Sequence, residues 1–386
     1  MAIAEGRVLA LGNLDEVMAH AGDSTQVIDL GSNVAYPGFV DSHSHWIGDR
    51  DMMGLDAAQA IDAALAHGWT SVAELWVDPA RMAELRDLDA TGQLRLRVDG
   101  YLAMNRPAPT GEHLGDWYQE YEAGFAPSDR LRFPGVKFTL DNGWGSQFWW
   151  ERDELADAVA RAHNAGWQVA SHTVSTEAHE MLLDALEAAM GGQPNVLRHR
   201  IEHAVQVTDE QLERIAGLDL VAVVQLGGSS SDWILEEDYL GNLGEDTAWL
   251  ARWRDLVDAG IHAGGAPDAP YTFPGFVPSL DVGTPMAQIA GAMDGIGPSN
   301  THPPDWVLAQ TLTAEQALEL VTTGGAYALG DEMRRGRLAP GTFADITILS
   351  GDMAAGTPSD IRGIDVVATI VGGVAEFCAD SAMCPG

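Results

Sequence analysis

The sequence predicts an α/β fold, a TIM-like (β/α)8 barrel joined to a small β domain that both chain termini build. Three observations lead to this fold. Eight short runs rich in Val, Ile, Leu and Phe recur along the chain, alanine-rich segments with helical spacing separate them, and both chain ends hold turn-separated strand-like pieces. A chain of 386 residues is longer than one hydrophobic core usually supports, so a barrel with an appended domain suits its length.

The eight strand-like runs set the order of the barrel. They cover residues 38–43, 71–76, 94–101, 135–141, 168–174, 199–205, 220–226 and 261–267. The helices expected between them cover residues 55–67, 79–88, 153–164, 176–190, 208–215 and 247–259. Parallel strands with crossover helices close into a barrel whose active site lies at the C-terminal strand ends. An open doubly wound sheet is the alternative, but no glycine-rich phosphate loop follows the first strand.

The two ends of the chain predict a β-sandwich-like domain. Residues 1–35 and 336–386 would form it, and residues 36–335 would form the barrel. The strand-like pieces at the ends are residues 7–11, 26–30, 345–349 and 366–371. Residues 264–304 are rich in Gly and Pro, and we expect them to form a long loop over the barrel mouth that caps a substrate.

Composition and charge limit the partners of this chain. Hydrophobic residues make up 46% of it and charged residues 20%, which is typical of a soluble globular protein. Lys and Arg total 21 and Asp and Glu total 57, so the net charge of −36 repels nucleic acid. No long apolar run predicts a membrane segment, and the first residues lack a secretion signal, so we expect a cytoplasmic protein. Whether it forms a homo-oligomer stays open.

The sharpest chemical feature is a His-x-His motif at the end of the first predicted strand. His43 and His45 are two residues apart, so both side chains project to the same face of a strand and can reach one metal ion. A lone His-x-His occurs by chance, so its place at a strand end carries the argument.

More ligand-type residues follow later strands. His172 ends the fifth predicted strand, His203 ends the sixth, and Asp268 follows the eighth. Each alone is as readily a capping or hydrogen-bonded polar residue. Four histidines and a carboxylate at four strand ends together predict a metal site, because a barrel brings these ends to one place.

Several of these motifs resemble the amidohydrolase superfamily. They are Pro37-Gly-Phe-Val-Asp-Ser-His-Ser-His45, the strand Gly135-Val-Lys-Phe138 leading to Asp141-Asn-Gly143, Val169-Ala-Ser-His172, His199-Arg-Ile-Glu-His-Ala204 and Gly336-Arg-Leu-Ala-Pro-Gly-Thr-Phe-Ala-Asp345. More narrowly they look like family 3, which includes N-substituted formamide deformylases. The resemblance covers essentially the whole chain, with the motifs in the family's order.

The resemblance implies a ligand set. His43 and His45 would bind the more buried metal with Asp268, and His172 and His203 would bind a second metal. Lys137, on the fourth strand, would carry a carbamate that bridges both, and its alternative is a pair with a nearby Asp or Glu. Zinc suits such nitrogen and oxygen ligands, as one or two ions, and manganese, iron and cobalt stay open.

The predicted substrate is a small molecule. Trp46, Trp76 and Trp144 fall after strands or in loops at the predicted mouth, and with Asp141 they are our candidates for substrate binding. The alternative is that the tryptophans only pack the loops. If they bind substrate, an aromatic group on the substrate would fit them.

The predicted function is a metal-dependent amidohydrolase that uses a metal-activated hydroxide to cleave a carbon–nitrogen bond in an amide, formamide or cyclic amide. A divalent metal brings the pKa of bound water near neutrality and polarises a carbonyl. Asp268 is the predicted catalytic residue, taking the water proton and delivering it to the leaving nitrogen. The alternatives are an ester or lactone hydrolase, a deaminase of the same superfamily, or a catalytically silent binding homologue.

Overall fold

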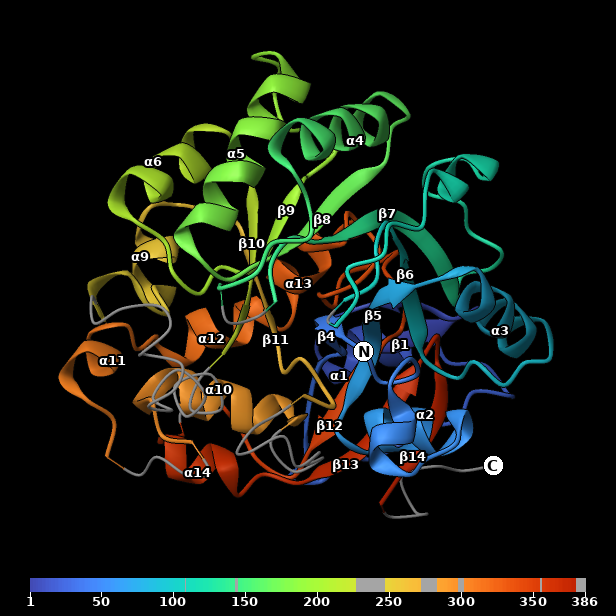
Figure 1. The fold of residues 1–386 in the computed structure, drawn as a ribbon. Helices are drawn as coiled ribbons and strands as arrows, with labels where there is room; N and C mark the ends of the chain where they lie inside the picture. The colour runs from blue at the N-terminus through green and yellow to red at the C-terminus, as the bar shows by residue number, and fades with distance from the viewer. Residues whose placement is uncertain are drawn as a thin grey trace.

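Eight parallel strands form the main sheet, and their order in space follows their order in the chain (Figure 1). The computed structural model describes residues 1–107, 109–142, 145–226, 247–271, 283–297, 302–354 and 356–379. The strands are β4 (Phe39–Ser44), β5 (Trp69–Val77), β6 (Arg97–Ala103), β7 (Leu131–Thr139), β8 (Gln168–Thr173), β9 (Arg200–His203), β10 (Val221–Gln225) and β11 (Ala263–Ala266). Each coincides with one of the predicted runs, so the barrel prediction is confirmed.

The first and last strands of this sheet meet through hydrogen bonds. The Ser42 hydroxyl donates to the Gly265 carbonyl at 3.0 Å, and the His45 amide donates to the Ala269 carbonyl at 2.8 Å. A Cβ on Gly264 would lie only 2.7 Å from the Ser42 hydroxyl oxygen, so the glycine lets β11 come close to β4. The sheet thereby curls into a nearly closed barrel.

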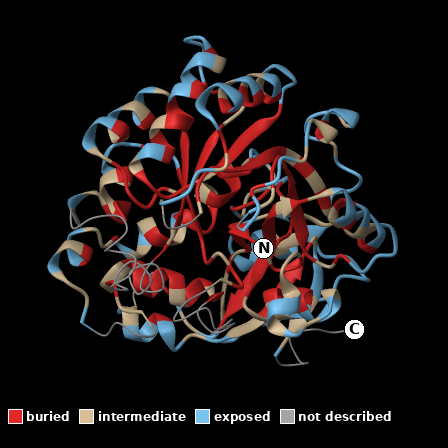
Figure 2. Ribbon diagram, viewed as in Figure 1, coloured by how far each residue is buried: buried red, intermediate tan, exposed pale blue. Residues whose placement is uncertain are grey.

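Helices surround the barrel, and most begin at a residue that caps the first turn. They are α2 (Ala57–Ala66), α3 (Pro79–Ala90), α4 (Arg152–Asn164), α5 (Thr176–Met190), α6 (Asp209–Gly217) and α9 (Trp253–Asp258). The side chains of Asp56, Asp78, Ser175 and Thr208 each accept a hydrogen bond from a first-turn amide. Strands and inner helix faces are buried and outer helix faces are exposed (Figure 2).

Two predicted segments differ from the structure. The helix expected over residues 247–259 is interrupted, because Ala251 has a φ of 47° and only η3 (Thr247–Trp249) and α9 form. The loop expected over residues 264–304 contains α10 (Pro285–Asp294), which Thr284 caps and Gly295 ends at a φ of 68°. Residues 272–282 and 298–301 of that expected loop lie outside the described residues.

The N-terminal end of the barrel is closed by α13 (Thr323–Ala328). Gly324 and Gly325 bring this helix against the backbone of β11 and β4, where a Cβ would lie 2.3 Å from the Ala263 oxygen and 2.8 Å from the Val40 oxygen. Ala326 of this helix packs among inward side chains that include Val40 and Tyr101. The opposite, C-terminal end is the end that carries the histidines.

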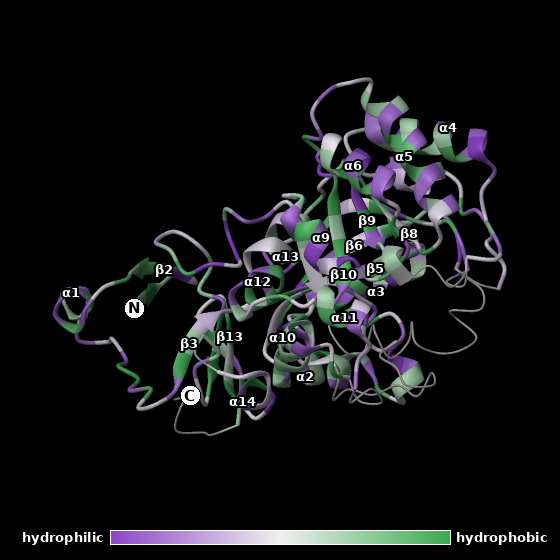
Figure 3. Ribbon diagram, turned by 90° about the vertical axis from the view of Figure 1, so that its left-hand side faces the viewer, coloured by the Kyte–Doolittle hydropathy of each residue, from purple (hydrophilic) through white to green (hydrophobic). Residues whose placement is uncertain are grey.

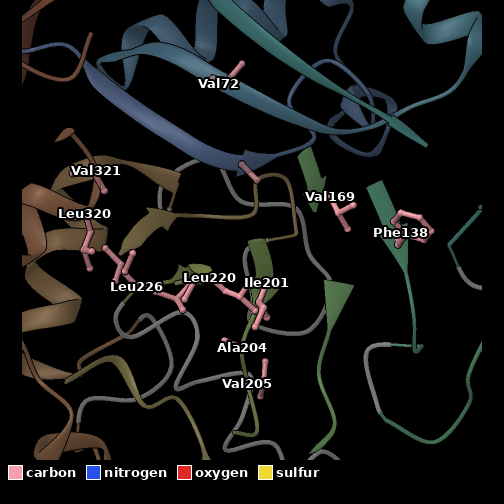
Figure 4. Close-up of a cluster of buried hydrophobic side chains, with 14 of the residues drawn as sticks. Val72, Phe138, Val169, Ile201, Ala204, Val205, Leu220, Leu226, Leu320 and Val321 are labelled. Carbon is pink, nitrogen blue, oxygen red and sulfur yellow. The ribbon is translucent and has the colours of Figure 1, made fainter. Parts of the chain in front are cut away.

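The outer core joins the strands to the surrounding helices. Figure 4 shows part of it, where Phe138, Val169 and Ile201 of neighbouring strands lie among buried aliphatic side chains. The same cluster reaches Leu320 of α12 (Ala314–Leu320) and Val321. Removing this apolar surface from water is the main stabilising contribution to the barrel.

Both chain termini contribute to a smaller β domain, as predicted. Its four-stranded antiparallel sheet has the order β14 (Val374–Cys378), β13 (Val366–Val371), β12 (Ile346–Leu349) and β3 (Val34–Pro37). A second, two-stranded sheet pairs β1 (Ala2–Ala4) with β2 (Arg7–Ala10). The strand expected over residues 26–30 does not form, and β3 takes its place, with its carboxyl end leading directly into β4.

The remaining helices are short. They are α1 (Leu14–Met18), η1 (Arg50–Met53), η2 (Trp117–Glu120), α11 (Asp305–Ala309) and α14 (Pro358–Arg362). Figure 3 shows α1 and β2 at the left, away from the barrel helices, and green apolar strands inside the barrel. None of the helices in the described part of the chain has both the length and the apolar character needed to cross a bilayer.

Candidate active site

The His-x-His motif and the last strand meet at the C-terminal end of the barrel. Nε2 of His43 lies 3.4 Å from Oδ1 of Asp268, and Nε2 of His45 lies 3.6 Å from the same oxygen. These three side chains each offer one ligand atom, and the three atoms lie within 4.8 Å of one another. The structure therefore brings together the three residues that the resemblance implied for the more buried metal.

The other two histidines extend the cluster along the strand ends. The ring of His203 lies 4.6 Å from that of His43 and 4.4 Å from that of His172, measured between centroids. The parallel register places Thr173 of β8 beside His203 of β9, so both strands end at the same level. All four predicted histidines thus form one continuous group.

Each histidine has one ring nitrogen next to an acceptor side chain. The nearest acceptor oxygens are Glu202 at 2.5 Å from His43, Gln225 at 2.9 Å from His203, Asp141 at 3.2 Å from His172 and Asp49 at 3.5 Å from His45. An acceptor that takes the N–H of one ring nitrogen fixes the tautomer and leaves the other nitrogen free for a metal. His43 and His203 make such a hydrogen bond, which leaves Nε2 of each ring free for a metal, while His172 and His45 lie next to a carboxylate without a hydrogen bond to it among the described residues.

Glu202 belongs to a buried network that the sequence analysis missed. Arg200 and Glu202 are both fully buried, and the Arg200 guanidinium donates to both carboxylate oxygens at 2.5 and 2.8 Å. Arg200 also donates to the Ser42 carbonyl at 2.6 Å, which ties β9 to β4 beneath His43. The Arg-x-Glu-His order on one strand was visible in the sequence, but the contact with His43 crosses the barrel.

Burial keeps three of these histidines neutral. It lowers the pKa of His43 and of His203 well below the usual value, and it lowers the pKa of His45 to about 4. The nearby positive charge of Lys137 adds to the effect in each case. Neutral imidazole is the form that binds metals.

Lys137 lies on β7 at the same end of the barrel and is 3% exposed. Burial lowers the pKa of its ammonium group to about 8, and the carboxylates of Glu202 and Asp268 oppose that effect. Its Nζ has no hydrogen-bond partner among the residues that the structure describes. It is also the only lysine in the sequence.

Asp268 faces the histidines from a strained backbone position. Its φ is 59°, and that of His203 is 75°, so both residues lie in the left-handed region that non-glycine residues rarely adopt. Burial raises the pKa of Asp268 to about 8, while Lys137 opposes this. Its Oδ1 atom is buried without a hydrogen-bond partner among the described residues.

These residues fit a divalent metal ion. Neutral imidazoles with one free nitrogen, a carboxylate and an unpartnered lysine nitrogen are the donors that zinc and similar ions take. The buried atoms without partners matter most, because such atoms are costly unless a ligand satisfies them. His43, His45 and Asp268 would hold one ion, and the rings of His203 and His172 continue the cluster from His43.

The four predicted substrate-binding residues lie at different depths. Trp46 is fully buried, and its indole N–H donates to Asp41 at 2.9 Å. Trp76 is half-buried and donates to the Asn105 carbonyl at 2.9 Å. Asp141 is fully buried and accepts hydrogen bonds from the Ser175 amide and hydroxyl. Trp144 lies outside the described residues. Contact with a substrate stays a prediction for all four.

Asp141 has a clear structural position beside His172. Burial raises the pKa of its carboxyl, but the His172 imidazole and the hydrogen bonds from Ser175 outweigh burial, so the pKa is below its usual value. An ionised Asp141 accepts the hydrogen bonds from Ser175 on Oδ2, and its Oδ1 lies 3.2 Å from Nε2 of His172.

The fold is a (β/α)8-type barrel, and histidines, a lysine and an aspartate that could bind metal lie at the C-terminal ends of its strands. Comparison with known proteins gives the family: the chain belongs to the amidohydrolase family, whose model matches residues 49–375. The resemblance seen in the sequence is thereby confirmed. His43 and His45 precede the matched residues, so their place in the site rests on the geometry.

Two relatives match part of the chain. The Bacillus subtilis (strain 168) protein YtcJ, named as an amidohydrolase, is 28% identical over 225 residues, which are 57% of this chain and 39% of YtcJ. The N-substituted formamide deformylase of Arthrobacter pascens is 26% identical over 235 residues, which are 60% of this chain and 40% of the deformylase. The match with this chain therefore covers about two fifths of the length of each relative.

A solved structure matches along the whole chain. Atrazine chlorohydrolase TrzN from Arthrobacter aurescens TC1, complexed with zinc, superposes with a TM-score of 0.65 and 16% identity. The match covers 100% of this chain and 91% of TrzN. At this identity the likeness shows that the two proteins share a fold.

Proposed function

We propose that this chain is a metal-dependent hydrolase that cleaves a carbon–nitrogen bond in a small amide, formamide or cyclic amide. The observation that carries the proposal is the approach of His43, His45 and Asp268 to within 4.8 Å at the mouth of the barrel. The family of the chain supports it, and so does the similarity to a formamide deformylase. We propose zinc as the metal, because zinc suits these ligands and TrzN was solved with zinc.

The protein residues contribute orientation and proton transfer. A divalent metal, when bound, supplies an activated water and polarises the carbonyl group. Asp268 accepts the proton of the attacking water on a carboxylate oxygen and then gives it to the leaving nitrogen, which departs poorly as an anion. Glu202 and Gln225 hold His43 and His203 by hydrogen bonds, and Asp49 and Asp141 lie beside His45 and His172, where they can orient these rings once a metal is bound.

Lys137 completes the proposed ligand set. A protonated ammonium group cannot bind a metal, and burial already disfavours the charged form of this lysine. Addition of carbon dioxide to the neutral amine with release of a proton gives a carbamate, which bears a negative charge and two oxygens. We propose that Lys137 takes this form, whose carbamate oxygens would be the donors that hold metal beside the histidines.

An activity screen tests this function. Purified protein would be stripped with a chelator, reloaded with zinc, manganese, iron(II) or cobalt, and assayed on N-formyl, N-acyl and cyclic amides alongside esters, lactones and aminopurines. We expect amide hydrolysis that disappears on stripping and returns with metal. Turnover of only the esters and lactones, or of only the aminopurines, would replace the proposal by one of those activities. No turnover of any substrate by metal-loaded protein would contradict it.

A further inference from the structure

Gln225 differs from the other side chains that orient the histidines. It is the last residue of β10 and pairs in register with Ala266 of β11, two residues before Asp268. Its Oε1 accepts the Nδ1–H of His203 at 2.9 Å. The corresponding partners of the other three histidines are the carboxylates of Glu202, Asp49 and Asp141.

An amide in place of a carboxylate brings an additional hydrogen-bond donor. A carboxylate can only accept, whereas the glutamine amide also carries an NH2 group with two donor hydrogens. The Nε2 atom of Gln225 is buried and has no hydrogen-bond partner among the described residues. Orienting His203 does not require this donor, since the Glu202 carboxylate orients His43 with acceptor oxygens alone.

The Gln225 side chain lies at the same strand ends as the proposed site. Nδ1 of His203, which the Gln225 oxygen contacts, is also 3.9 Å from Oδ2 of Asp268. The amide oxygen of Gln225 and the carboxylate of Asp268 therefore both approach the same ring nitrogen of His203 at the strand ends. A buried donor without a partner is costly in a folded protein, and such a group at a site is commonly satisfied by a ligand.

We propose that the Nε2 group of Gln225 donates a hydrogen bond to the carbonyl oxygen of the bound substrate. This inference rests on the proposed function and assigns a side chain of this chain to the carbonyl oxygen at the scissile bond. Negative charge grows on that oxygen during attack on the carbonyl carbon, so the hydrogen bond strengthens in the transition state. Gln225 thus contacts substrate and also positions His203.

Two substitutions separate these two roles. Gln225→Glu keeps an acceptor for His203 and replaces the donor by a second acceptor of the same shape. Gln225→Leu removes both the acceptor and the donor. Metal affinity, measured by competition with a chelator, reports on the positioning role, and kcat/KM for the best amide from the screen reports on the donor role.

We expect Gln225→Glu to bind zinc at least as tightly as the wild type and to lose roughly ten- to a hundredfold in kcat/KM. Gln225→Leu should lose zinc affinity by about tenfold as well, as expected when a histidine loses its orienting partner. Wild-type kcat/KM in Gln225→Glu would overturn the inference. Loss of zinc from Gln225→Glu, with the wild-type melting temperature, would also overturn it, because the role would then be positioning alone.

A binding measurement keeps the inference testable without turnover. Calorimetric titration of the zinc-loaded protein with 2-pyrrolidinone, a small cyclic amide, should show binding to the wild type that weakens about tenfold or more in Gln225→Glu. Equal affinity, or no binding to the wild type, would contradict the inference. If the wild type binds this amide more tightly than Gln225→Glu but hydrolyses no substrate, the proposed function is wrong and the hydrogen bond from Gln225 is still supported.

Discussion

The two ends of the barrel bury charged groups in opposite ways. At the N-terminal end, Asp99 is fully buried between Arg132, at 2.6 Å, and Arg335, and every one of these charges has an oppositely charged partner. At the C-terminal end, Lys137 Nζ and Asp268 Oδ1 are buried without a hydrogen-bond partner among the described residues. The first arrangement stabilises the fold. The second leaves atoms available for ligands, at a cost in stability that the rest of the barrel offsets.

The same contrast appears in the link between the domains. Arg97 of β6 donates to both carboxylate oxygens of Asp345 at 2.6 and 2.9 Å, next to the start of β12. Such a bidentate, buried pair fixes geometry. At the active-site end, in contrast, Nε2 of His43 and Nε2 of His45 lie 3.4 and 3.6 Å from Oδ1 of Asp268, which is longer than a hydrogen bond and leaves space for an ion among the three atoms.

The largest expected effect on stability comes from removing the carboxylate of the buried ion pairs at the N-terminal end of the barrel. Asp99→Ala leaves Arg132 and Arg335 buried without their carboxylate, so we expect a loss of about 3–5 kcal/mol in the free energy of unfolding. Denaturant unfolding measures it. Asp62→Ala, which removes an exposed carboxylate paired with Arg95, is the control and should change stability by less than about 1 kcal/mol. Equal effects of the two substitutions would contradict the contrast.

The Asp99 pair also predicts a pH dependence. Burial raises the pKa of Asp99, but Arg132 and Arg335 outweigh burial and hold it below its usual value. A carboxyl with a lower pKa in the folded state contributes its full stability above the unfolded pKa of about 4 and loses it as the pH falls through the folded pKa. Stability of the wild type should therefore decline below about pH 4 more steeply than that of Asp99→Ala. Parallel curves would show that Asp99 does not carry this dependence.

At the unpaired end, Asp268→Asn should reduce catalysis. The substitution keeps the size of the side chain and one oxygen for the metal but removes its basicity. We expect hydrolysis of the best substrate to fall roughly a hundredfold or more, as for loss of a general acid/base, while metal content falls much less. Near wild-type turnover by a fully metallated variant would mean that another group carries the proton.

A smaller effect is expected from the partner of His45. Asp49 lies 3.5 Å from Nδ1 of this histidine and accepts a hydrogen bond from the Tyr271 hydroxyl at 2.8 Å. Asp49→Asn should weaken metal affinity by about tenfold, measured by chelator competition, with little change in melting temperature. Tyr271→Phe keeps Asp49 and serves as the control, with a smaller change expected. Unchanged metal affinity in Asp49→Asn would show that His45 does not depend on Asp49 for metal binding.

The carbamate on Lys137 is the most specific prediction about the site, and the sequence makes it easy to test. Because Lys137 is the only lysine, protein prepared with 13C-labelled bicarbonate should show a single carbamate signal by 13C NMR, and Lys137→Ala should abolish it. Lys137→Ala should also hold about one ion fewer than the wild type. A metal-loaded crystal structure with Lys137 unmodified and turned away from the ions would rule the carbamate out.

The local sequence pattern was enough to predict the strands and the meeting of four histidines at the strand ends. Strand ends follow from alternation and from turn residues, and a barrel brings the ends together whatever the details. Glu202, Asp49 and Gln225 were missed because their roles arise from contacts between side chains that are far apart in the sequence. Residues 26–30 have the apolar pattern of a strand, yet β3 provides the strand that pairs with β12. For α10, Thr284, Pro285 and Gly295 signalled a helix that the glycine and proline content obscured.

The most direct test of the metal site is the metal content of the double variant His43→Ala/His45→Ala. Wild-type protein, purified with metal in the growth medium, should contain one to two divalent ions per chain by elemental analysis. The double variant should lose most of this metal, while His20→Ala, which changes an exposed histidine near α1, should retain it. Unchanged metal content in the double variant would contradict the account, because it would place the metal somewhere other than the strand-end histidines.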